Sequence, residues 1–361
     1  LTSDEIYAQC TLYVQEELVE AFKQSSTWKS FHAILPIPKP FEADLSMTVA
    51  TNAAFSISVG AEGDAVTVHY PDGFQETKVG ADGALTLAFS HTMDQSKVAD
   101  EKRILISAPK AIRLTTQGTG LIACSFIREL PLQELTLRFE SELTALDLSQ
   151  LSSLTLINLG GCSKLTSLTL PTIAPQLKSL QLPNTAVSSL TLTSYPTLEE
   201  LDLASVGLSQ VTLTGLTKLR TLDLSDNKLT TIDLTGLTAI STLRVGNNQL
   251  TELTLSSTTF EELNVEHNHL SSLDLSQVTK IGALYCNDNN FTLDKLPVKG
   301  SVISAYIYAP QAKHQLPQTI AQGEMLDLSA IASLQGVLAQ PAASTFSWYD
   351  HEGNLLTEGT D

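Results

Sequence analysis

Basic residues are scarce in this sequence. Its 361 residues include 21 lysines and arginines against 39 aspartates and glutamates, which gives a formal net charge of −18 at pH 7. Nucleic acids and anionic membranes are bound through concentrated positive charge, so the sequence argues against both as partners. The acidic surplus is expected mainly to keep the protein soluble.

Several kinds of motif are also missing. The cysteines Cys10, Cys124, Cys162 and Cys286 form no CxxC pair, so neither a zinc ribbon nor a redox centre is expected. The sequence does not decide whether Cys10 and Cys124 form a disulfide. The sequence contains no run of about 20 apolar residues, which is the length that would span a membrane. The sequence contains neither a phosphate-binding glycine motif nor a Ser/His/Asp constellation, so it does not predict an enzyme. We expect no cofactor and no metal.

Aromatic residues make up 6% of the chain and hydrophobic residues 42%, so the core must be mostly leucine, valine, isoleucine and alanine. These residues follow a repeat whose cleanest copy is LRTLDLSDNKLTTIDL, residues 219–234. Successive LxxLxL units lie 20 to 23 residues apart and end at Leu137, Leu159, Leu182, Leu203, Leu224, Val245, Val265 and Cys286. This spacing predicts a leucine-rich repeat solenoid of about eight turns. A weaker LxL follows in each repeat, so each turn is expected to carry two strand-like pieces.

The position three residues after each of these ends should hold a buried asparagine. An asparagine there can satisfy both the N–H and the C=O groups that a turning backbone leaves without strand partners. The last four turns carry Asn227, Asn248, Asn268 and Asn289. The first four turns carry Glu140, Cys162, Thr185 and Val206, and we expect them to be less regular. Ahead of them, AIRLTTQGTGLIAC at 111–124 looks like a degenerate turn.

The segments around the repeats have other periods. Apolar residues at three- and four-residue steps predict an amphipathic helix at 2–24, which the prolines of LPIPKPF at 35–41 follow. Between about residues 44 and 109 the period changes to two, with turn signals at 62–64, 71–73 and 81–83, which predicts an antiparallel sandwich. The repeat stops after Pro297, and FSWYDHEGN at 346–354 looks like the third strand and turn of an immunoglobulin-like module.

This two-halved repeat resembles the leucine-rich repeats of internalin-type bacterial surface proteins, in which all-β modules bracket the array. The segment AVTVHYPDGF at 65–74 is similar to PKD-like or immunoglobulin-like modules. The resemblance implies a mainly β fold in four parts. These are an N-terminal helix and proline-rich linker at 1–40, a β-sandwich at 41–110, the solenoid at 111–297 and an incomplete immunoglobulin-like segment at 298–361.

Residues between the first-strand leucines should point to the concave face of the solenoid. The candidate ligand-binding residues on that face are Glu200, Asp202, Asp223, Arg244, Glu262, Asn264 and Tyr285. Asp202 and Asp223 should lie about 5 Å apart on neighbouring strands, a separation that would suit a retaining glycosidase. We expect Arg244 to neutralise this pair and the smooth sheet to offer no water-excluding pocket. His267 and His269 could suggest a metal site, but exposed loop histidines are the simpler interpretation.

We therefore expect a non-enzymatic adhesion or binding protein that uses the concave face to bind a protein or glycan. The alternatives are a structural spacer that displays the flanking β domains and, less favoured, a hydrolase using Asp202 and Asp223. The resemblance implies a secreted or bacterial surface location, and we expect a monomer. Because the chain starts at Leu1 rather than Met, we expect that an export signal or other upstream segment was removed. Lipid or wall anchoring, and whether the chain continues beyond Asp361, stay open.

Overall fold

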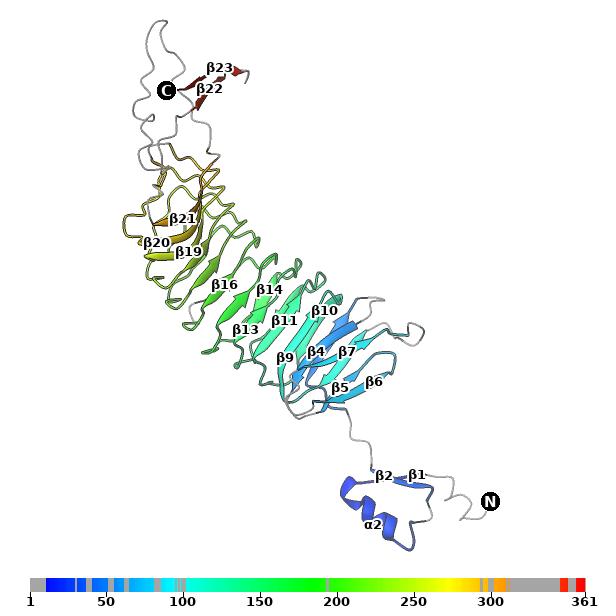
Figure 1. Cartoon of the computed structure of the whole chain (residues 1–361). Helices are drawn as coiled ribbons and strands as arrows, with labels where there is room; N and C mark the ends of the chain where they lie inside the picture. The colour runs from blue at the N-terminus through cyan, green and yellow to red at the C-terminus, as the bar shows by residue number, and fades with distance from the viewer. Residues whose placement is uncertain are drawn as a thin grey trace. The chain divides into compact units, whose positions relative to one another are not determined.

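The structure, a computed structural model, describes residues 11–29, 31–36, 41–50, 55–61, 65–80, 86–94, 96, 98, 102–192, 195–292, 295–297, 302–309, 311, 345–349 and 355–360. The fold is mainly β, and α2 (Val19–Gln24) is the one α-helix in these residues (Figure 1). The chain divides into two compact units, Leu1–Ala43 and Asp44–Asp361.

The first unit contains two short strands and α2. Strand β1 (Thr11–Val14) is followed by the 3-10 turn η1 (Glu16–Leu18) and α2, and it pairs in parallel with β2 (Ala33–Pro36). The predicted helix at 2–24 is therefore wrong over Thr11–Leu18, and its first nine residues, 2–10, lie outside the described residues. Pairing with β2 overrides the helical period, because β-branched and aromatic residues such as Thr11, Tyr13 and Val14 fit a strand well.

The second unit is built from two sheets, a hairpin and a short pair of strands. The strands are β3 (Leu45–Val49), β4 (Phe55–Ala61), β5 (Ala65–His69), β6 (Gln75–Val79), β7 (Leu87–His91), β8 (Arg103–Ser107), β9 (Ala111–Gln117), β10 (Leu121–Phe126), β11 (Glu134–Arg138), β12 (Ala145–Asp147), β13 (Leu156–Asn158), β14 (Ser167–Thr169), β15 (Ser179–Gln181), β16 (Glu200–Asp202), β17 (Thr221–Asp223), β18 (Thr242–Arg244), β19 (Thr259–Asn264), β20 (Lys280–Tyr285), β21 (Ile303–Ile307), β22 (Thr345–Tyr349) and β23 (Leu355–Thr360).

The larger sheet, which we call the front sheet, has twelve strands in the order β21-β20-β19-β18-β17-β16-β15-β13-β11-β9-β4-β7. From β9 to β21 all neighbours are parallel, whereas β4 pairs antiparallel with β9 and with β7. The smaller five-stranded sheet has the order β10-β3-β8-β5-β6. The front sheet therefore starts in the sandwich-like region and continues without a break into the solenoid (Figure 1).

The solenoid core consists of stacked apolar columns, as the sequence predicts. The first-strand ends Leu137, Leu159 and Leu224 are completely buried, as are Cys162 and Cys286. A third column of apolar residues, five positions after most strand ends, is also buried and comprises Val187, Leu208, Leu229, Leu250, Leu270 and Phe291. Cys124 is a buried free thiol, and Cys10 lies outside the described residues.

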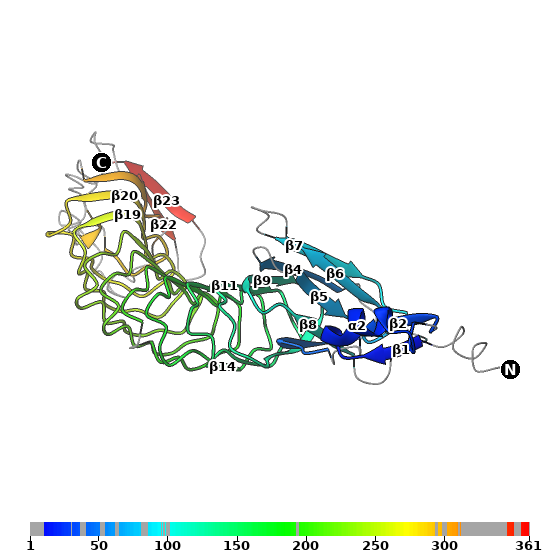
Figure 2. The same cartoon turned by 90° about the horizontal axis from the view of Figure 1, so that it is seen from below.

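The opposite side of the coils, which we call the back layer, is much less continuous. Strands β12 and β14 form a two-stranded parallel sheet, but the corresponding pieces at 190–192, 211–213, 232–234, 253–255 and 273–275 form no strands. Figure 2 shows β11 and β14 on opposite sides of the coils, with β14 on the outer side of the curve. Neighbouring strands pair at a spacing of about 4.8 Å, and coils diverge on the outside of a curve, so we infer that the later coils are too far apart there to pair. Two strands per turn is therefore wrong for most coils.

The asparagine column satisfies the turning backbone as expected. Asn248 Oδ1 accepts the Leu229 N–H at 3.0 Å, while its Nδ2 donates to the carbonyls of Leu224, Val245 and Gly246 at 2.9 to 3.1 Å. Asn227 and Asn268 repeat this set of bonds. The residue before each asparagine has a positive φ, between 50° and 56° for Asp226, Asn247, His267 and Asp288. We call this column the ladder.

The ladder changes its chemistry toward both ends. In the first coil, the completely buried Glu140 accepts the N–H groups of Thr119 and Leu121 and the Thr119 hydroxyl at 3.0 to 3.2 Å. After Asn289, Gln311 takes over, because its Oε1 accepts the Asn289 N–H at 3.2 Å and its Nε2 donates to the Cys286 carbonyl at 2.9 Å. The stacking also outlasts the leucine pattern, since β21 pairs with β20 beyond Pro297.

Candidate binding surface

The structure places the predicted concave residues side by side on the front sheet. Strand pairing aligns Gln181 with Asp202, Asp202 with Asp223, Asp223 with Arg244, Arg244 with Asn264, and Asn264 with Tyr285. Glu200 and Glu262 lie in the adjacent column, aligned with Thr221 and Thr242 respectively. Each of these side chains is half-buried, so the face is open to solvent but crowded.

Several of these residues also end their own strands. Asp202 Oδ1 accepts the Ala204 N–H at 3.0 Å, and Asp223 and Asn264 accept the N–H groups of Ser225 and Glu266 in the same way. Asn158 does so for Gly160. The same column has Gln181 in another coil. The residue two positions after Gln181 is Pro183, which has no N–H to donate. The frequency of Asp and Asn in this column thus has a structural cause, which the Asx spacing in the sequence could have shown.

Arg244 binds mainly to Glu262. Its Nε and Nη2 donate to the two carboxylate oxygens of Glu262 at 2.8 and 2.7 Å, a bidentate pair. Its Nη1 lies 3.7 Å from Asp223 Oδ2. The expectation that Arg244 neutralises Asp202 and Asp223 holds in part: Arg244 lies within ion-pair distance of Asp223, but its two short bonds go to Glu262, which offers the planar guanidinium two well-directed acceptors.

Asp202 consequently lies in an acidic cluster, which we define as Glu200, Asp202 and Asp223. Burial raises the pKa of Asp202, and the neighbouring Asp223 and Glu200 carboxylates add to that rise. The hydrogen bond from Ala204 and the more distant Arg244 oppose it. A raised pKa means that the folded protein holds this carboxylate in a poorly compensated environment. A cation placed beside Asp202 would relieve the repulsion among the three carboxylates of the cluster.

The two flanks of the acidic cluster differ in polarity. Toward the first coils, Asn158 Nδ2 donates to Gln181 Oε1 at 2.6 Å and Ser179 Oγ donates to Glu200 Oε2 at 2.7 Å, which fixes a row of neutral polar groups. Toward the last coil, Tyr285 aligns with Ile307, whose side chain is 47% exposed. Sequence reasoning missed Ile307, because it lies beyond the leucine pattern.

The histidine pair forms no metal centre. His267 has a φ of 50° and its Nε2 lies 3.5 Å from Asp288 Oδ2 on the next coil. In the part of the chain that the structure describes, no group of three or more His, Cys, Asp or Glu side chains is arranged to hold a metal ion. No helix within the described residues is long and apolar enough to cross a membrane.

Three pockets lie away from the acidic cluster. They are lined by residues 168–172, 189–191 and 195, by residues 124–126, 147 and 149–151, and by residues 273, 275–276, 295–297 and 302–303, with volumes of about 340, 170 and 330 Å³. None of these three is lined by Asp202 or Asp223. The water-excluding pocket that a hydrolase would need is thus not among them.

The fold and the repeat together define a leucine-rich repeat solenoid. The sequence profile of the leucine rich repeat matches residues 196–250, which include Asp202, Asp223 and Arg244. No curated protein matches the chain closely enough to count as a relative.

Several solved structures are similar over part of the chain. The functional domain of InlJ from Listeria monocytogenes, which includes a cysteine ladder, is 18% identical over 61% of this chain and 56% of its own, with a TM-score of 0.37. The internalin inlF from Listeria monocytogenes is 22% identical over 58% and 65%, with a TM-score of 0.37. A leucine-rich repeat protein of Leptospira interrogans is 19% identical over 52% and 68%, with a TM-score of 0.26. The chain thus spans less than two thirds of the first two structures.

Proposed function

We propose that this protein is a non-enzymatic binding protein, secreted or displayed on a bacterial surface, that captures a protein or glycan on its front sheet. The observation that carries the proposal is the acidic cluster on that sheet, whose three carboxylates meet a cation, among the ion pairs of the described residues, only through the 3.7 Å contact of Arg244 with Asp223. The cluster is fixed in place by strand pairing, because Asp202 and Asp223 are aligned on β16 and β17. A solenoid of this kind offers an extended, rigid surface with independent side-chain positions.

The charge of the surface indicates the chemistry of the partner. Glu262 occupies Arg244 through two short bonds, so the three carboxylates of the acidic cluster have no cation at comparable distance among the ion pairs of the described residues. Lysine or arginine side chains of a protein partner would complement the cluster. The neutral row at Asn158 and Gln181 and the exposed Ile307 would supply polar and apolar contacts on either side.

The test is to remove charge without removing the strand-end hydrogen bonds. In the double variant Asp202→Asn/Asp223→Asn, each asparagine keeps an Oδ1 that can accept the Ala204 or Ser225 N–H. A partner is first selected from arrays of matrix proteins and glycans, and its affinity is then measured by biolayer interferometry at two salt concentrations. We expect the double variant to bind about tenfold more weakly or worse, and to lose most of the salt dependence.

The matched control is Asp233→Asn/Asp274→Asn on the back layer. These aspartates accept the N–H groups of Thr235 and Ser276 at 2.9 and 2.8 Å, so the control makes the same charge change in the same local motif. The control should bind as the unaltered protein does. The proposal is contradicted if both variants weaken binding equally or if neither weakens it. Unchanged capture by the double variant would favour the spacer role instead.

A further inference from the structure

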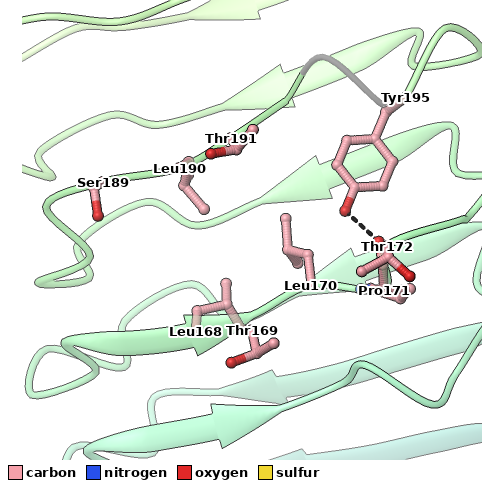
Figure 3. A pocket seen from close by; sticks show the side chains of 9 residues that line it. All are labelled: Leu168, Thr169, Leu170, Pro171, Thr172, Ser189, Leu190, Thr191 and Tyr195. Carbon is pink, nitrogen blue, oxygen red and sulfur yellow. Dashed lines mark hydrogen bonds between the residues drawn. The ribbon is translucent and has the colours of Figure 1, made fainter.

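The largest of the three described pockets lies in the back layer, where strand pairing stops. Its volume is about 340 Å³, at the small end of ligand-binding sites. It is lined by Leu168, Thr169, Leu170, Pro171, Thr172, Ser189, Leu190, Thr191 and Tyr195. In Figure 3, Leu170 and Leu190 point toward each other across the gap between two coils, and Tyr195 reaches from the upper coil toward Pro171.

The pocket exists because two successive coils separate there. Strand β14 pairs with β12 on one side, but no backbone hydrogen bond of the described residues joins Leu168–Leu170 to Ser189–Thr191 on the other. The main-chain N–H and C=O groups along this edge therefore take part in no strand pairing. They can donate to and accept from a molecule in the gap.

Tyr195 is a departure from the repeat that closes one end of the pocket. The buried column to which it belongs has Ala174 in the coil before and Leu216 and Leu237 in the coils after. Tyr195 is only 3% exposed, and its hydroxyl donates to the Pro171 carbonyl at 2.6 Å, which bridges the two coils. Leucine would fill the column but could not make this bond, so the ring is held as a fixed wall of the pocket.

The lining is neutral and has two kinds of surface. Leu168, Leu170, Leu190 and the Tyr195 ring are apolar, whereas Thr169, Thr172, Ser189 and Thr191 bring hydroxyls that both donate and accept. None of the lining residues carries a charge, so an ionic ligand would lose hydration without gaining a counter-charge. The ligand should therefore be uncharged, with one apolar face and several hydrogen-bonding groups.

We propose that this pocket binds a neutral, hydroxyl-bearing ring compound of monosaccharide size. A sugar ring combines a face of C–H groups with an edge of hydroxyls, which matches the two kinds of lining. An added peptide strand fits less well, because the next coil already lies alongside the free edge of β14. A lipid chain would leave the hydroxyls of the lining without partners. The site is separate from the acidic cluster and does not depend on the function proposed for the front sheet.

The test uses neutral and charged sugars as probes for the full chain. Saturation-transfer difference NMR is recorded with methyl glucoside and N-acetylglucosamine, and with glucuronate as the charged comparison. We expect saturable binding of at least one neutral probe with a dissociation constant in the millimolar range, and at least about tenfold weaker binding of glucuronate. The absence of saturable binding of either neutral probe, or equal binding of glucuronate, would overturn the proposal.

Two variants locate the binding. Thr169→Val/Thr191→Val removes two hydroxyls from the lining, and its matched control Thr212→Val/Thr254→Val removes two from equally exposed positions of later coils. Only the first pair should weaken binding, by about tenfold. Tyr195→Leu, which introduces the residue of the later coils, should fold, as judged by circular dichroism, and also lose binding. Equal losses in the pair and its control, or full binding by Tyr195→Leu, would overturn the assignment.

Discussion

The four coils that carry the asparagines, called here the last four, and the four coils before them, called the first four, solve the same backbone problem in different ways. In the last four, an asparagine bonds the turning backbone of each coil to the preceding one. In the first four, Glu140 and Cys162 reach neighbouring backbone, Thr185 bonds only its own coil through Leu182, and Val206 has no polar side-chain atom. The first coils add β12–β14 pairing in the back layer instead.

This difference shows that the asparagine is one solution among several. The backbone just before the ladder position turns in the same way in both halves at Ser205 and Asn184, whose φ values of 58° and 57° are close to those before the asparagines. What changes is how much hydrogen bonding each ladder residue carries. The halves should therefore respond differently to substitution, and the acidic cluster spans their junction because Asp202 precedes Val206 and Asp223 precedes Asn227.

The largest effect is expected at Glu140, the buried end of the ladder. Glu140→Ala leaves the Thr119 and Leu121 N–H groups without their acceptor in a completely buried site. Unsatisfied buried groups cost about 1–3 kcal/mol each, so we expect a loss of about 3 kcal/mol or more in the free energy of unfolding. Guanidinium denaturation followed by circular dichroism measures it, with hydrogen exchange at Thr119 and Leu121 as the local readout.

Thr185→Val is the control within the same half. It removes one hydroxyl bond, to the Leu182 carbonyl, and should cost about 1 kcal/mol. Glu140→Gln keeps one acceptor oxygen and should lie between the two. If Glu140→Ala costs no more than Thr185→Val, the buried carboxylate does not hold the first coil, and the contrast between the halves loses its strongest member.

A smaller effect of opposite sign is expected from extending the asparagines by one coil. In Val206→Asn, the register places the new Oδ1 against the Val187 N–H and the new Nδ2 against the Leu182 and Leu203 carbonyls. Because Ser205 already has the required positive φ, we expect no loss and a gain of up to about 1 kcal/mol in the free energy of unfolding. Val206→Ala, which has no amide, should be destabilised. A clear loss in Val206→Asn would mean that the halves differ in backbone as well as in side chain.

The sequence predicted the repeating parts of the fold well, because each repeat shows the same residue in the same surroundings. The leucine columns, the asparagines and the alignment of Asp202 with Asp223 all follow from a constant register. Prediction from the sequence failed where contacts between distant segments determine the secondary structure. Strand β1 depends on pairing with β2, and the unpaired back layer depends on the spacing of the coils.

The candidate surface was predicted as a set of positions rather than as a set of interactions. Register shows that Arg244 has Asp223 on one side and Asn264 on the other, but not that its guanidinium turns toward Glu262. The rotamer that decides this depends on three-dimensional packing. The strand-end role of Asp202 was readable, since its Oδ1 serves an N–H two residues on. Tyr195 was readable too, as the aromatic member of an aliphatic column.

The smallest effect on stability is expected at the junction of the halves. Asp202 on the front sheet and Asp233 on the back layer each accept the N–H of the residue two positions on, but their pKa values shift in opposite directions. Burial raises the pKa of Asp202, whereas hydrogen bonds from Thr235 lower that of Asp233. A raised folded-state pKa means that ionised Asp202 costs stability above that pKa, and that the cost disappears as the pH falls below the ordinary value. A lowered pKa means that Asp233 contributes stability at neutral pH, which is lost in acid.

Asp202→Asn should therefore be more stable than the unaltered protein at pH 7, by less than about 1 kcal/mol, with the gain vanishing near pH 3. Asp233→Asn should be slightly less stable at pH 7 and equal in strong acid. Denaturation midpoints between pH 2 and 8 give both curves. If Asp202→Asn is destabilised at pH 7 as Asp233→Asn is, the strand-end bond outweighs the repulsion within the acidic cluster. The cluster would then be compensated in the free protein, and a cationic partner would gain little there.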